Sequence, residues 1–412
     1  MNYKSRHRML RPYSVDQRDM KIYQYDIAIV GAGPAGSAVA YFLAKSGLNV
    51  ALIDKAAFPR DKTCGDGVSP RALQVLDQMG LLQELTACAH TINHLDLFAP
   101  NGIRCEAEVP RMRGLPAYTV VAPRLLLDEL IFQRARAVGA IYKQLEITEP
   151  IKENGRIVGL KSRTESIRAK LIVIATGAAT RLLDATGFLR RKPTLMVAAR
   201  QYFDHLPTQP DRLEFYFDHV PLPGYAWLFP TSATSANIGI GYFGKLQASP
   251  RSLLEKFYTQ HPRIAPLLKD ARPVGPIKGY PLRVDFPESV PLIDGAIAVG
   301  EAIGLVNPFT GEGIDYALES GQIAAECILA AHDFTLAGLR EYPRRLDERF
   351  RRYFILITRM RDLFYNTFML NRIFGRGASN RFIRETIMDI CFGETDPIHA
   401  FSPRMLWNIL KP

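Results

Sequence analysis

A glycine-rich segment near the start of the chain has the residue types that bind a pyrophosphate. Residues 31–36 read Gly-Ala-Gly-Pro-Ala-Gly, and Asp54 follows them. Gly31 permits a tight turn after a strand, Gly33 lets the backbone approach a phosphate, and Gly36 lets a helix pack closely on a strand. The free amides and positive end of that helix would hold the phosphates, and Asp54 would accept hydrogen bonds from ribose hydroxyls. The pattern predicts a dinucleotide site without separating NAD from FAD.

A second segment carries a thiol between flexible residues. Residues 62–67 read Lys-Thr-Cys-Gly-Asp-Gly. The glycines would let this loop move, and a thiol can act as a proton donor or as a redox-sensitive contact. Cys64 is therefore a candidate catalytic residue, with a small packing residue as the alternative. Lys62 and Arg71 would lower the pKa of the thiol if they point toward it.

A third segment lies far along the chain. It reads Gly-Glu-Ala-Ile-Gly at residues 300–304 and Asn-Pro-Phe-Thr-Gly-Glu-Gly at residues 307–313. The carboxylate of Glu301 can reach the ribityl hydroxyls of FAD, and the rigid Pro308 could line one face of a flavin. Gly311 and Gly313 open a helix whose first amides, from Ile314 onward, would face the flavin edge where negative charge develops on reduction. This segment favours FAD over NAD, with a plain strand–loop–helix as the alternative.

Apolar runs around the motifs predict the elements that must position them. Strands are expected at 25–30, 50–53, 169–175 and 296–299, and helices at 34–46, 69–79, 123–138 and 314–325. Parallel strands joined by helices favour a doubly wound sheet covered on both faces. Strands at 195–199, 213–217, 225–229 and 237–242 are separated by proline and glycine turns, which predicts an antiparallel sheet in a second domain.

The expected class is therefore α/β, or α+β overall, with a discontinuous Rossmann-type FAD-binding domain and an inserted antiparallel-sheet substrate domain. The predicted FAD-binding domain comprises 22–90, 111–185 and 286–334, and the predicted substrate domain comprises 91–110 and 186–285. A flexible basic segment is expected at 1–21. Residues 335–412 are expected to be helical.

The formal charge of +11 bears on partners. A basic protein favours acidic substrates, phosphate groups or an anionic membrane face. No nucleic-acid recognition module is found, so nucleic acid is not expected as a partner. Five cysteines without a CxxC pair argue against a disulfide framework or a zinc site and for a reducing, cytoplasmic compartment. The eight histidines form no metal-binding pattern, so no metal is expected.

Two segments bear on membrane contact. Residues 27–44 are uncharged and mostly apolar, which mimics a membrane span, but the glycine motif interrupts them and favours the nucleotide site. Any contact is therefore expected to be peripheral, at the inner membrane face. Eleven arginines lie between residues 344 and 384, interleaved with aromatic residues. Such helices could lie on an anionic bilayer or pack on the core with a solvated arginine face, and the sequence leaves both open.

Together these motifs resemble the geranylgeranyl reductase family, within the FAD-binding group that includes p-hydroxybenzoate hydroxylase. The resemblance covers roughly residues 24–330. The family motifs match at Gly31, Gly33, Gly36 and Asp54, at Lys62, Cys64, Gly65 and Gly67, and at Gly300, Gly304, Pro308, Gly311, Glu312 and Gly313. The resemblance implies that FAD is bound by Gly31, Gly33, Ala35, Gly36, Asp54, Lys55, Cys64, Gly65, Arg124, Gly300, Glu301, Pro308, Gly311, Gly313 and Ile314. For Arg124 the alternative is a solvent-exposed arginine at a helix start.

A further family segment implies a lipid pocket. It reads Pro-Gly-Tyr-Ala-Trp-Leu-Phe-Pro at residues 223–230. Tyr225, Trp227 and Phe229 alternate along a predicted strand and would share one face. An aromatic face suits a polyprenyl chain, because isoprene units bind through apolar area. Ordinary sheet packing is the alternative for any single ring.

Two departures from the family pattern concern the cofactor. Glu301 stands where the family has an aspartate one methylene shorter. The mid-chain Asp-Gly of the wider group is Thr176-Gly177 here, and threonine cannot supply the charge. Conventional NADPH docking is therefore in doubt, and the electron donor is left open between NAD(P)H and ferredoxin.

The implied activity is reduction of isolated C=C bonds of a polyprenyl chain by an FAD-dependent oxidoreductase. The carrier is expected to be a quinone, a chlorophyll precursor or an isoprenoid lipid. Hydride would come from the reduced flavin, and an acid or water would protonate the second carbon. An FAD-dependent monooxygenase or halogenase and a non-catalytic flavin-binding protein are the alternatives. The oligomeric state is left open.

Overall fold

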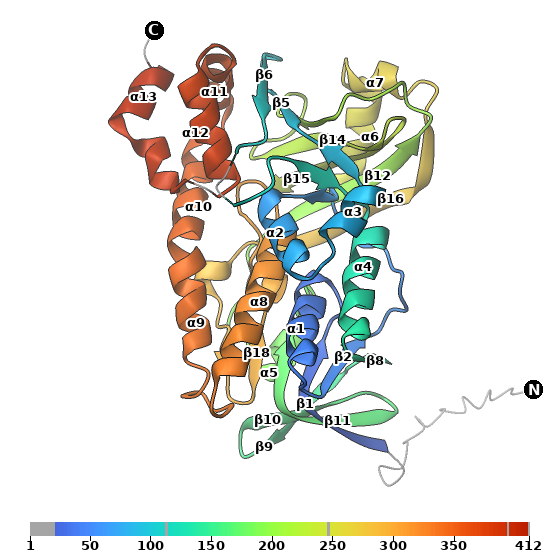
Figure 1. Ribbon diagram of the computed structural model, residues 1–412. Helices are drawn as coiled ribbons and strands as arrows, with labels where there is room; N and C mark the ends of the chain where they lie inside the picture. Colours follow the sequence, from blue (N-terminus) through green and yellow to red (C-terminus); the bar gives the residue numbers. More distant parts are fainter. Residues whose placement is uncertain (1–20, 112–113, 245–247, 394, 411–412) are drawn as a thin grey trace, which may run out of the picture.

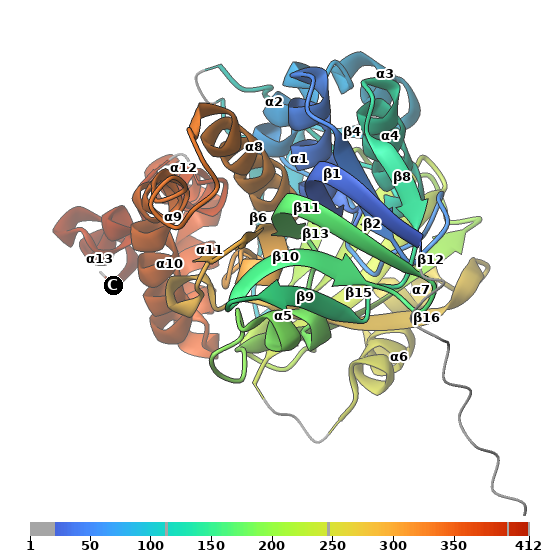
Figure 2. The same cartoon turned by 90° about the horizontal axis from the view of Figure 1, so that it is seen from below.

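The computed structural model describes residues 21–111, 114–244, 248–393 and 395–410. The segment 1–21, predicted to be flexible, lies outside these residues except for Lys21, which begins the first strand. The described chain forms two large sheets side by side and a helical layer made by its C-terminal part (Figures 1 and 2).

The first sheet has eight strands and carries the nucleotide motif. Its main order is β17 (Leu292–Ile293), β18 (Ala296–Ala298), β11 (Glu165–Ile174), β1 (Lys21–Val30), β2 (Val50–Asp54) and β8 (Ile141–Gln144), with β9 (Glu149–Glu153) and β10 (Arg156–Lys161) attached through β11. The four strands β18, β11, β1 and β2 pair in parallel. Helices α1 (Pro34–Lys45), α4 (Arg124–Ala137) and α8 (Ile314–Ala330) pack together beside it (Figure 1). The predicted doubly wound α/β sheet is confirmed.

Glycine geometry fixes the turn between β1 and α1. Gly31 has a φ of +104°, and a Cβ there would lie 2.1 Å from the carbonyl oxygen of Ala175. A Cβ on Gly36 would lie 1.8 Å from the carbonyl oxygen of Gly31. Only glycine fits such a turn and such a close approach of helix to strand. Pro34 then begins α1, where its missing amide proton costs no hydrogen bond.

The second sheet has seven strands. Their order is β16 (Arg272–Arg283), β12 (Leu195–Asp204), β15 (Ser235–Phe243), β14 (Gly224–Ser232), β13 (Arg212–Tyr216), β5 (His94–Phe98) and β6 (Arg104–Glu108). All neighbours are antiparallel except β13 and β5, which are parallel. The prediction of a wholly antiparallel sheet is therefore wrong at this pair. Because more than a hundred residues separate β5 from β13, no hairpin fixes their relative direction.

Of the short elements between the two sheets, only the helix expected at 69–79 was predicted, and it is confirmed as α2 (Pro70–Gln78). Strands β3 (Gly67–Val68), β7 (Thr119–Val121) and β4 (His90–Ile92) form a small third sheet. Helices α2 and α3 (Leu82–Cys88) follow β3 in the chain. The cysteine loop at 62–66 runs directly into β3, so this small sheet holds one end of the loop.

The C-terminal part is helical, as predicted. It comprises α9 (Glu341–Leu346), α10 (Arg352–Phe364), α11 (Thr367–Ser379), α12 (Arg381–Cys391) and α13 (Pro403–Leu410). Buried Phe364, Leu370 and Phe374 belong to the same core as Trp227 and Phe229 of β14. The helices therefore cover one face of the second sheet, and α6 (Pro250–Gln260) and α7 (Ile264–Leu267) cover the other. The exact domain boundaries stay a prediction.

Candidate functional site

A cavity of about 490 Å³ connects the three parts of the fold. Its lining includes the glycine loop after β1, the cysteine loop, the inner face of the second sheet and the C-terminal helices. Of the predicted cofactor and substrate residues, those that line it are Gly31, Gly33, Ala35, Asp54, Lys55, Cys64, Gly65, Arg124, Tyr225, Trp227, Phe229, Glu301, Gly311, Gly313 and Ile314. Gly36, Gly300 and Pro308 do not line it. The motifs thus converge on one site although hundreds of residues separate them.

The three predicted residues outside the lining have other places. Gly36 makes the close helix–strand contact described above. Gly300 has a φ of +61°, and a Cβ there would lie 2.9 Å from the Cβ of Ala35. Pro308 is buried beneath the helical layer, and its carbonyl oxygen accepts a hydrogen bond from Arg361 at 3.5 Å. The predicted stacking of Pro308 on a flavin face therefore has no support from the cavity lining.

The nucleotide end of the cavity is built around Asp54. Its Oδ2 accepts a hydrogen bond from the Ala32 amide at 2.9 Å, and its Oδ1 accepts one from the Ala56 amide at 3.0 Å. A Cβ on Gly33 would lie 3.3 Å from the guanidinium of Arg60. Asp54 therefore braces the glycine loop, and the absence of a side chain on Gly33 keeps the space under Arg60 open.

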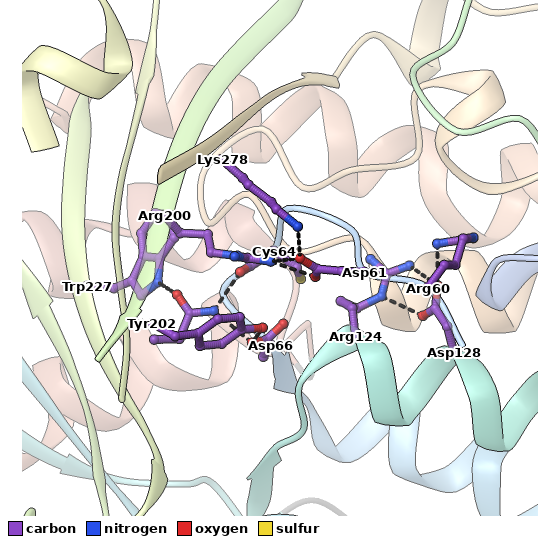
Figure 3. A network of polar contacts seen from close by, with 11 residues as sticks. Arg60, Asp61, Cys64, Asp66, Arg124, Asp128, Arg200, Tyr202, Trp227 and Lys278 are labelled. Carbon is purple, nitrogen blue, oxygen red and sulfur yellow. Dashed lines mark hydrogen bonds and ion pairs between the residues drawn. The ribbon is translucent and has the colours of Figure 1, made fainter. Parts of the chain in front are cut away.

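Two arginines share one carboxylate at this end (Figure 3). Arg124 is buried, and its Nε and Nη2 donate to the two oxygens of Asp128 at 2.6 and 2.7 Å. Arg60 Nη1 lies 3.0 Å from Asp128 Oδ2. The Asp128 carboxylate raises the pKa of Arg124 far above its usual value, so the guanidinium stays charged despite burial. Arg60 Nε also lies 3.8 Å from Asp54 Oδ2, so two guanidiniums balance two carboxylates here, and guanidinium N–H groups beside the glycine loop suit a pyrophosphate. The alternative of a solvent-exposed Arg124 is excluded.

The second and third motifs are joined by an ion pair. Lys62 Nζ lies 2.8 Å from Glu301 Oε2, and the Arg283 amide donates to Glu301 Oε1 at 3.3 Å. A Cβ on Gly177 would lie 3.2 Å from Glu301 Oε2. Gly177, in the Thr176-Gly177 segment that differs from the family pattern, therefore lies beside this ion pair. Glu301 reaches Lys62 with the extra methylene that distinguishes it from the family's aspartate.

The cysteine loop is pinned to the second sheet by polar contacts (Figure 3). Asn237 Nδ2 donates at 2.7 Å both to the Cys64 carbonyl oxygen and to Asp66 Oδ2. Tyr202 Oη donates to Asp66 Oδ2 at 2.5 Å, and Trp227 Nε1 donates to Asn237 Oδ1 at 3.0 Å. Strands β12, β14 and β15 thus hold the loop through three side chains. We call Asp66, Tyr202, Trp227 and Asn237 the loop anchor.

A charged contact holds the start of the same loop. Arg200 Nη2 lies 2.6 and 2.7 Å from the two oxygens of Asp61, and Lys278 Nζ lies 2.7 Å from Asp61 Oδ2 (Figure 3). The guanidinium of Arg200 lies over the Tyr202 ring at 4.3 Å. Because both ends of residues 61–66 are bound to the second sheet, the loop connects the FAD end of the cavity to its aromatic face.

The environment of Cys64 differs from the prediction. Burial raises the pKa of the Cys64 thiol, and Arg124 opposes this rise more than Lys62 does. Arg71 instead pairs with Asp315 at 3.6 Å and with Glu319 at 2.5 Å. Lys62 therefore acts in the expected direction and Arg71 does not, but the pKa of the thiol is raised overall because desolvation outweighs the nearby positive charge. Burial also raises the pKa of Asp66 to about 6, against its hydrogen bonds from Tyr202 and Asn237.

The aromatic residues of β14 share one face, as predicted. Tyr225, Trp227 and Phe229 all line the cavity. A Cβ on Gly65 would lie 3.1 Å from the Phe229 ring, and a Cβ on Gly239 would lie 2.1 Å from the Trp227 ring. Glycine on the neighbouring strand therefore makes room for the indole. The aromatic face lies directly against the cysteine loop.

The C-terminal helices supply a lining that the sequence interpretation missed. Their apolar residues in the cavity include Met360, Phe364, Leu370, Ile373, Phe374, Met388, Met405 and Ile409. The arginine and aromatic pattern indicated a helix face but not what that face covers. The cavity therefore continues from the polar FAD end into an apolar chamber between β14 and the helices. In the part of the chain that the structure describes, no cluster of His, Cys, Asp and Glu could hold a metal ion.

Comparison with known proteins decides the family. Residues 24–215 match the FAD binding domain family, and residues 195–272 match the geranylgeranyl reductase catalytic domain. A menaquinone reductase of Mycobacterium tuberculosis is 33% identical over 354 residues, which cover 81% of this chain and 83% of that protein. The chain belongs to the geranylgeranyl reductase family. This family member is an FAD-dependent oxidoreductase, as the motifs predicted.

Other relatives and structures agree on the fold. A digeranylgeranylglycerophospholipid reductase of Methanopyrus kandleri is 29% identical, over 80% of this chain and 87% of that protein. A geranylgeranyl bacteriochlorophyll reductase-like structure from Thermoplasma acidophilum has a TM-score of 0.80 at 22% identity, covering 93% of this chain and 98% of that one. The flavin-dependent brominase Bmp2 has a TM-score of 0.75 at 21% identity, covering 92% and 96%. The fold alone therefore does not separate reductase from halogenase.

Proposed function

We propose that this geranylgeranyl reductase family member saturates isolated C=C bonds in the polyprenyl chain of a membrane lipid. The observation that supports this most directly is one continuous cavity, with the FAD motifs at one end and an apolar chamber at the other. The names of two relatives suggest the first carriers to test, an isoprenoid quinone and a digeranylgeranyl glycerophospholipid. The electron donor stays open between NAD(P)H and ferredoxin.

The described residues fit FAD at the nucleotide end. Gly33 leaves an open cradle under Arg60, and Arg124 brings a buried positive charge to the cavity. FAD, when bound, supplies the hydride chemistry of the reaction. The chain's own part is to bring the prenyl chain to the Cys64 loop and to exclude water, because an unactivated alkene is a poor hydride acceptor. A catalytic role of Cys64 itself stays a prediction.

Anaerobic turnover is the experiment that tests this function. We expect photoreduced holoenzyme, mixed without oxygen with a menaquinone that bears an unsaturated prenyl chain, to reoxidise as the lipid is consumed. Because reduction of the quinone ring also adds two hydrogens, the extracted lipid is first reoxidised in air to the quinone. Mass spectrometry should then find two extra hydrogens per reduced bond in the prenyl chain and no added oxygen. A digeranylgeranyl glycerophospholipid in a parallel reaction distinguishes the carriers. Oxygen incorporation in air without anaerobic saturation would favour a monooxygenase or halogenase, and failure of reduced flavin to react with either would favour a non-catalytic protein.

We infer in addition that the C-terminal helices touch an anionic membrane. Four large apolar side chains on α10, α11 and α13 are at least half exposed: Leu363, Phe368, Trp407 and Leu410. Phe368 and Arg372 lie one helical turn apart, and Arg372 Nη2 donates to the Leu410 carbonyl oxygen at 2.8 Å, so α11 meets the end of α13 here. The same helices wall the apolar chamber. A lipid could therefore pass from the bilayer into the cavity without crossing water.

Three features of the chain bear on this peripheral contact. Among the described residues no helix is long and apolar enough to cross a bilayer. All five cysteines are free, which suits the reducing side of the membrane. The net charge of +11 gives the protein a long-range attraction to anionic lipid.

Liposome flotation tests the membrane surface. We expect binding to vesicles with anionic lipid, weaker binding to neutral vesicles, and release by salt, because charges are screened beyond about 10 Å at 0.1 M. The double variant Phe368→Ser/Trp407→Ser should bind several-fold less well. Ile22→Ser is the matched control, because Ile22 is 68% exposed on β1, at the opposite end of the molecule from α13 (Figure 1). Equal binding of the double variant and the control would contradict the proposed surface.

A further inference from the structure

A carboxyl group that has no assigned role lines the cavity at Glu312. It belongs to the Gly-Glu-Gly turn before α8. The Glu312 carbonyl oxygen accepts a hydrogen bond from the Asn307 amide at 2.7 Å, and its own amide donates to Thr310 Oγ1 at 3.3 Å. Next to it, a Cβ on Gly311 would lie 3.4 Å from Tyr225 Oη. The turn is therefore fixed at its backbone and lies against the aromatic face of β14.

The groups that interact electrostatically with Glu312 come from four elements. They are Ser69 and Arg71 at the start of α2, Asp315 and Tyr316 on α8, Tyr225 on β14 and Cys391 on α12. Burial raises the pKa of Glu312, and the nearby carboxylate of Asp315 raises it further, while Ser69 and Arg71 act in the opposite direction. The balance favours a protonated carboxyl at neutral pH.

The neighbouring acid Asp315 differs from Glu312 because its carboxylate is part of a chain of ion pairs. Arg71 Nη1 lies 3.6 Å from Asp315 Oδ2, and Arg71 Nη2 lies 2.5 Å from Glu319. Glu319 also pairs with Arg349, which is 45% exposed. A chain of ion pairs thus runs from Asp315 to the surface beneath the helical layer. Asp315 has a guanidinium partner, whereas Glu312 lines the cavity and its carboxyl has Ser69 as a hydrogen-bonding neighbour.

The other acids beside the aromatic face are poorer proton donors. The Cys64 thiol has a pKa raised by burial and is a weak acid. Burial raises the pKa of Asp66 only to about 6, because the hydrogen bonds that one of its oxygens accepts from Tyr202 and Asn237 favour the carboxylate form. The Tyr225 hydroxyl donates to the Thr310 carbonyl oxygen, and burial raises its pKa as well. Glu312 combines a position at the aromatic face with a carboxyl that burial keeps protonated.

We propose that Glu312 is the acid that protonates the substrate alkene. This inference rests on the proposed function. Reduced FAD, when bound, would supply a hydride with its electron pair to one alkene carbon, and the Glu312 carboxyl would give its proton to the other carbon. The O–H bond of Glu312 breaks and the π electrons form the new C–H bond to its proton, while the electron pair of the hydride would form the other C–H bond. The carboxylate then recovers a proton from water, because burial and Asp315 disfavour its charge.

Two substitutions at Glu312 distinguish the effect of losing the acidic proton from the effect of changing the side-chain length. Glu312→Gln keeps the size and cannot supply the proton, whereas Glu312→Asp keeps the acid one methylene further back. Glu326→Gln, on the exposed side of α8, is the matched control. We expect Glu312→Gln to lower the anaerobic single-turnover rate by about 10²- to 10⁴-fold, the usual contribution of a general acid, with flavin content and lipid binding close to wild type. Glu312→Asp should retain part of the rate.

The pH profile gives a readout that a structural role would not change. The wild-type rate should fall as pH rises through the pKa of Glu312, and the slow rate of Glu312→Gln should no longer follow that step. Infrared difference spectra provide a test without turnover. The C=O stretch of a protonated carboxyl should be present at neutral pH in the oxidised holoenzyme, shift in D₂O, and be missing from Glu312→Gln but not from Glu326→Gln.

The possible results distinguish failure of the proposed role of Glu312 from failure of the proposed reductase function. Wild-type enzyme that saturates the lipid while Glu312→Gln is equally fast would overturn the role of Glu312 alone. Equal loss of rate in Glu312→Gln and Glu312→Asp, with the pH step retained, would also overturn it. A wild-type holoenzyme that reduces no prenyl lipid would overturn the proposed function and this role with it.

Discussion

Replacing Gly33 by tryptophan is expected to give a folded protein without FAD. Gly33 lies at the start of α1 and lines the cavity, and the one neighbour near a Cβ there is the flexible end of Arg60 at 3.3 Å. The indole would therefore point into the space where the pyrophosphate must meet the backbone, rather than into the packed core. Purified wild-type protein should be yellow, and Gly33→Trp should be colourless, with at least a tenfold lower flavin content by absorbance.

The control for this variant places the same side chain at the other end of the helix. Ser46 follows the last turn of α1 and is exposed. Ser46→Trp should keep full flavin content, and both variants should show the wild-type far-ultraviolet circular dichroism. A folded Gly33→Trp that retains full flavin would mean that the glycine loop is not the phosphate site.

The features that the sequence predicted well depend on short stretches of chain. The tight turn at Gly31 and the close packing at Gly36 require glycine for steric reasons within one strand–helix unit. The alternation of Tyr225, Trp227 and Phe229 needs only the two-residue period of a strand. In each case the chemistry of neighbouring residues limits the backbone to few conformations, so the local geometry could be predicted without knowledge of the tertiary structure.

The features that could not be predicted from the sequence depend on contacts between residues that are far apart in the chain. Asp66 meets Tyr202 and Asn237 across more than 130 residues, and neither partner belongs to a motif. The raised pKa of the Cys64 thiol was missed for the same reason: residue spacing shows nearby charges but not the burial that outweighs them. One residue could have indicated these contacts from the sequence. Asp66 is an acid inside the cysteine motif, and an acid in such a loop needs polar partners when it is buried.

The role of the C-terminal helices was the largest gap. An amphipathic pattern shows that one helix face avoids water, but it does not show whether that face packs on a core, on a bilayer or around a ligand. Here much of the apolar face lines the chamber, including Ile373, Met405 and Ile409. The end of the chamber at α13 is therefore set by residues that no cofactor motif identifies. These residues should limit the length of the prenyl chain that the enzyme accepts.

Filling that end should shorten the accepted prenyl chain. Ile409 lines the cavity on α13, and Ile409→Trp adds a large ring where the last isoprene units of a long chain would lie. Excluding one five-carbon unit forfeits roughly 3–4 kcal/mol of burial at about 0.8 kcal/mol per CH₂ group, or at least a hundredfold in binding. Long-chain substrates should therefore lose at least tenfold in kcat/KM even after partial repacking, while a substrate with two isoprene units should react nearly as in wild type.

Leu410, the residue after Ile409, provides the matched control for this test of chain length. Leu410 is 50% exposed on the same helix, so Leu410→Trp adds the same ring mostly to the surface and should leave the preference for chain length unchanged. Substrates of two to nine isoprene units, compared under anaerobic conditions with flavin content measured for each variant, give the profile. If Ile409→Trp lowers kcat/KM equally for short and long chains, the apolar chamber is not the channel for the prenyl chain. A preference shifted only in Ile409→Trp would mean that α13 closes the channel, because the added volume acts only on chains long enough to reach it.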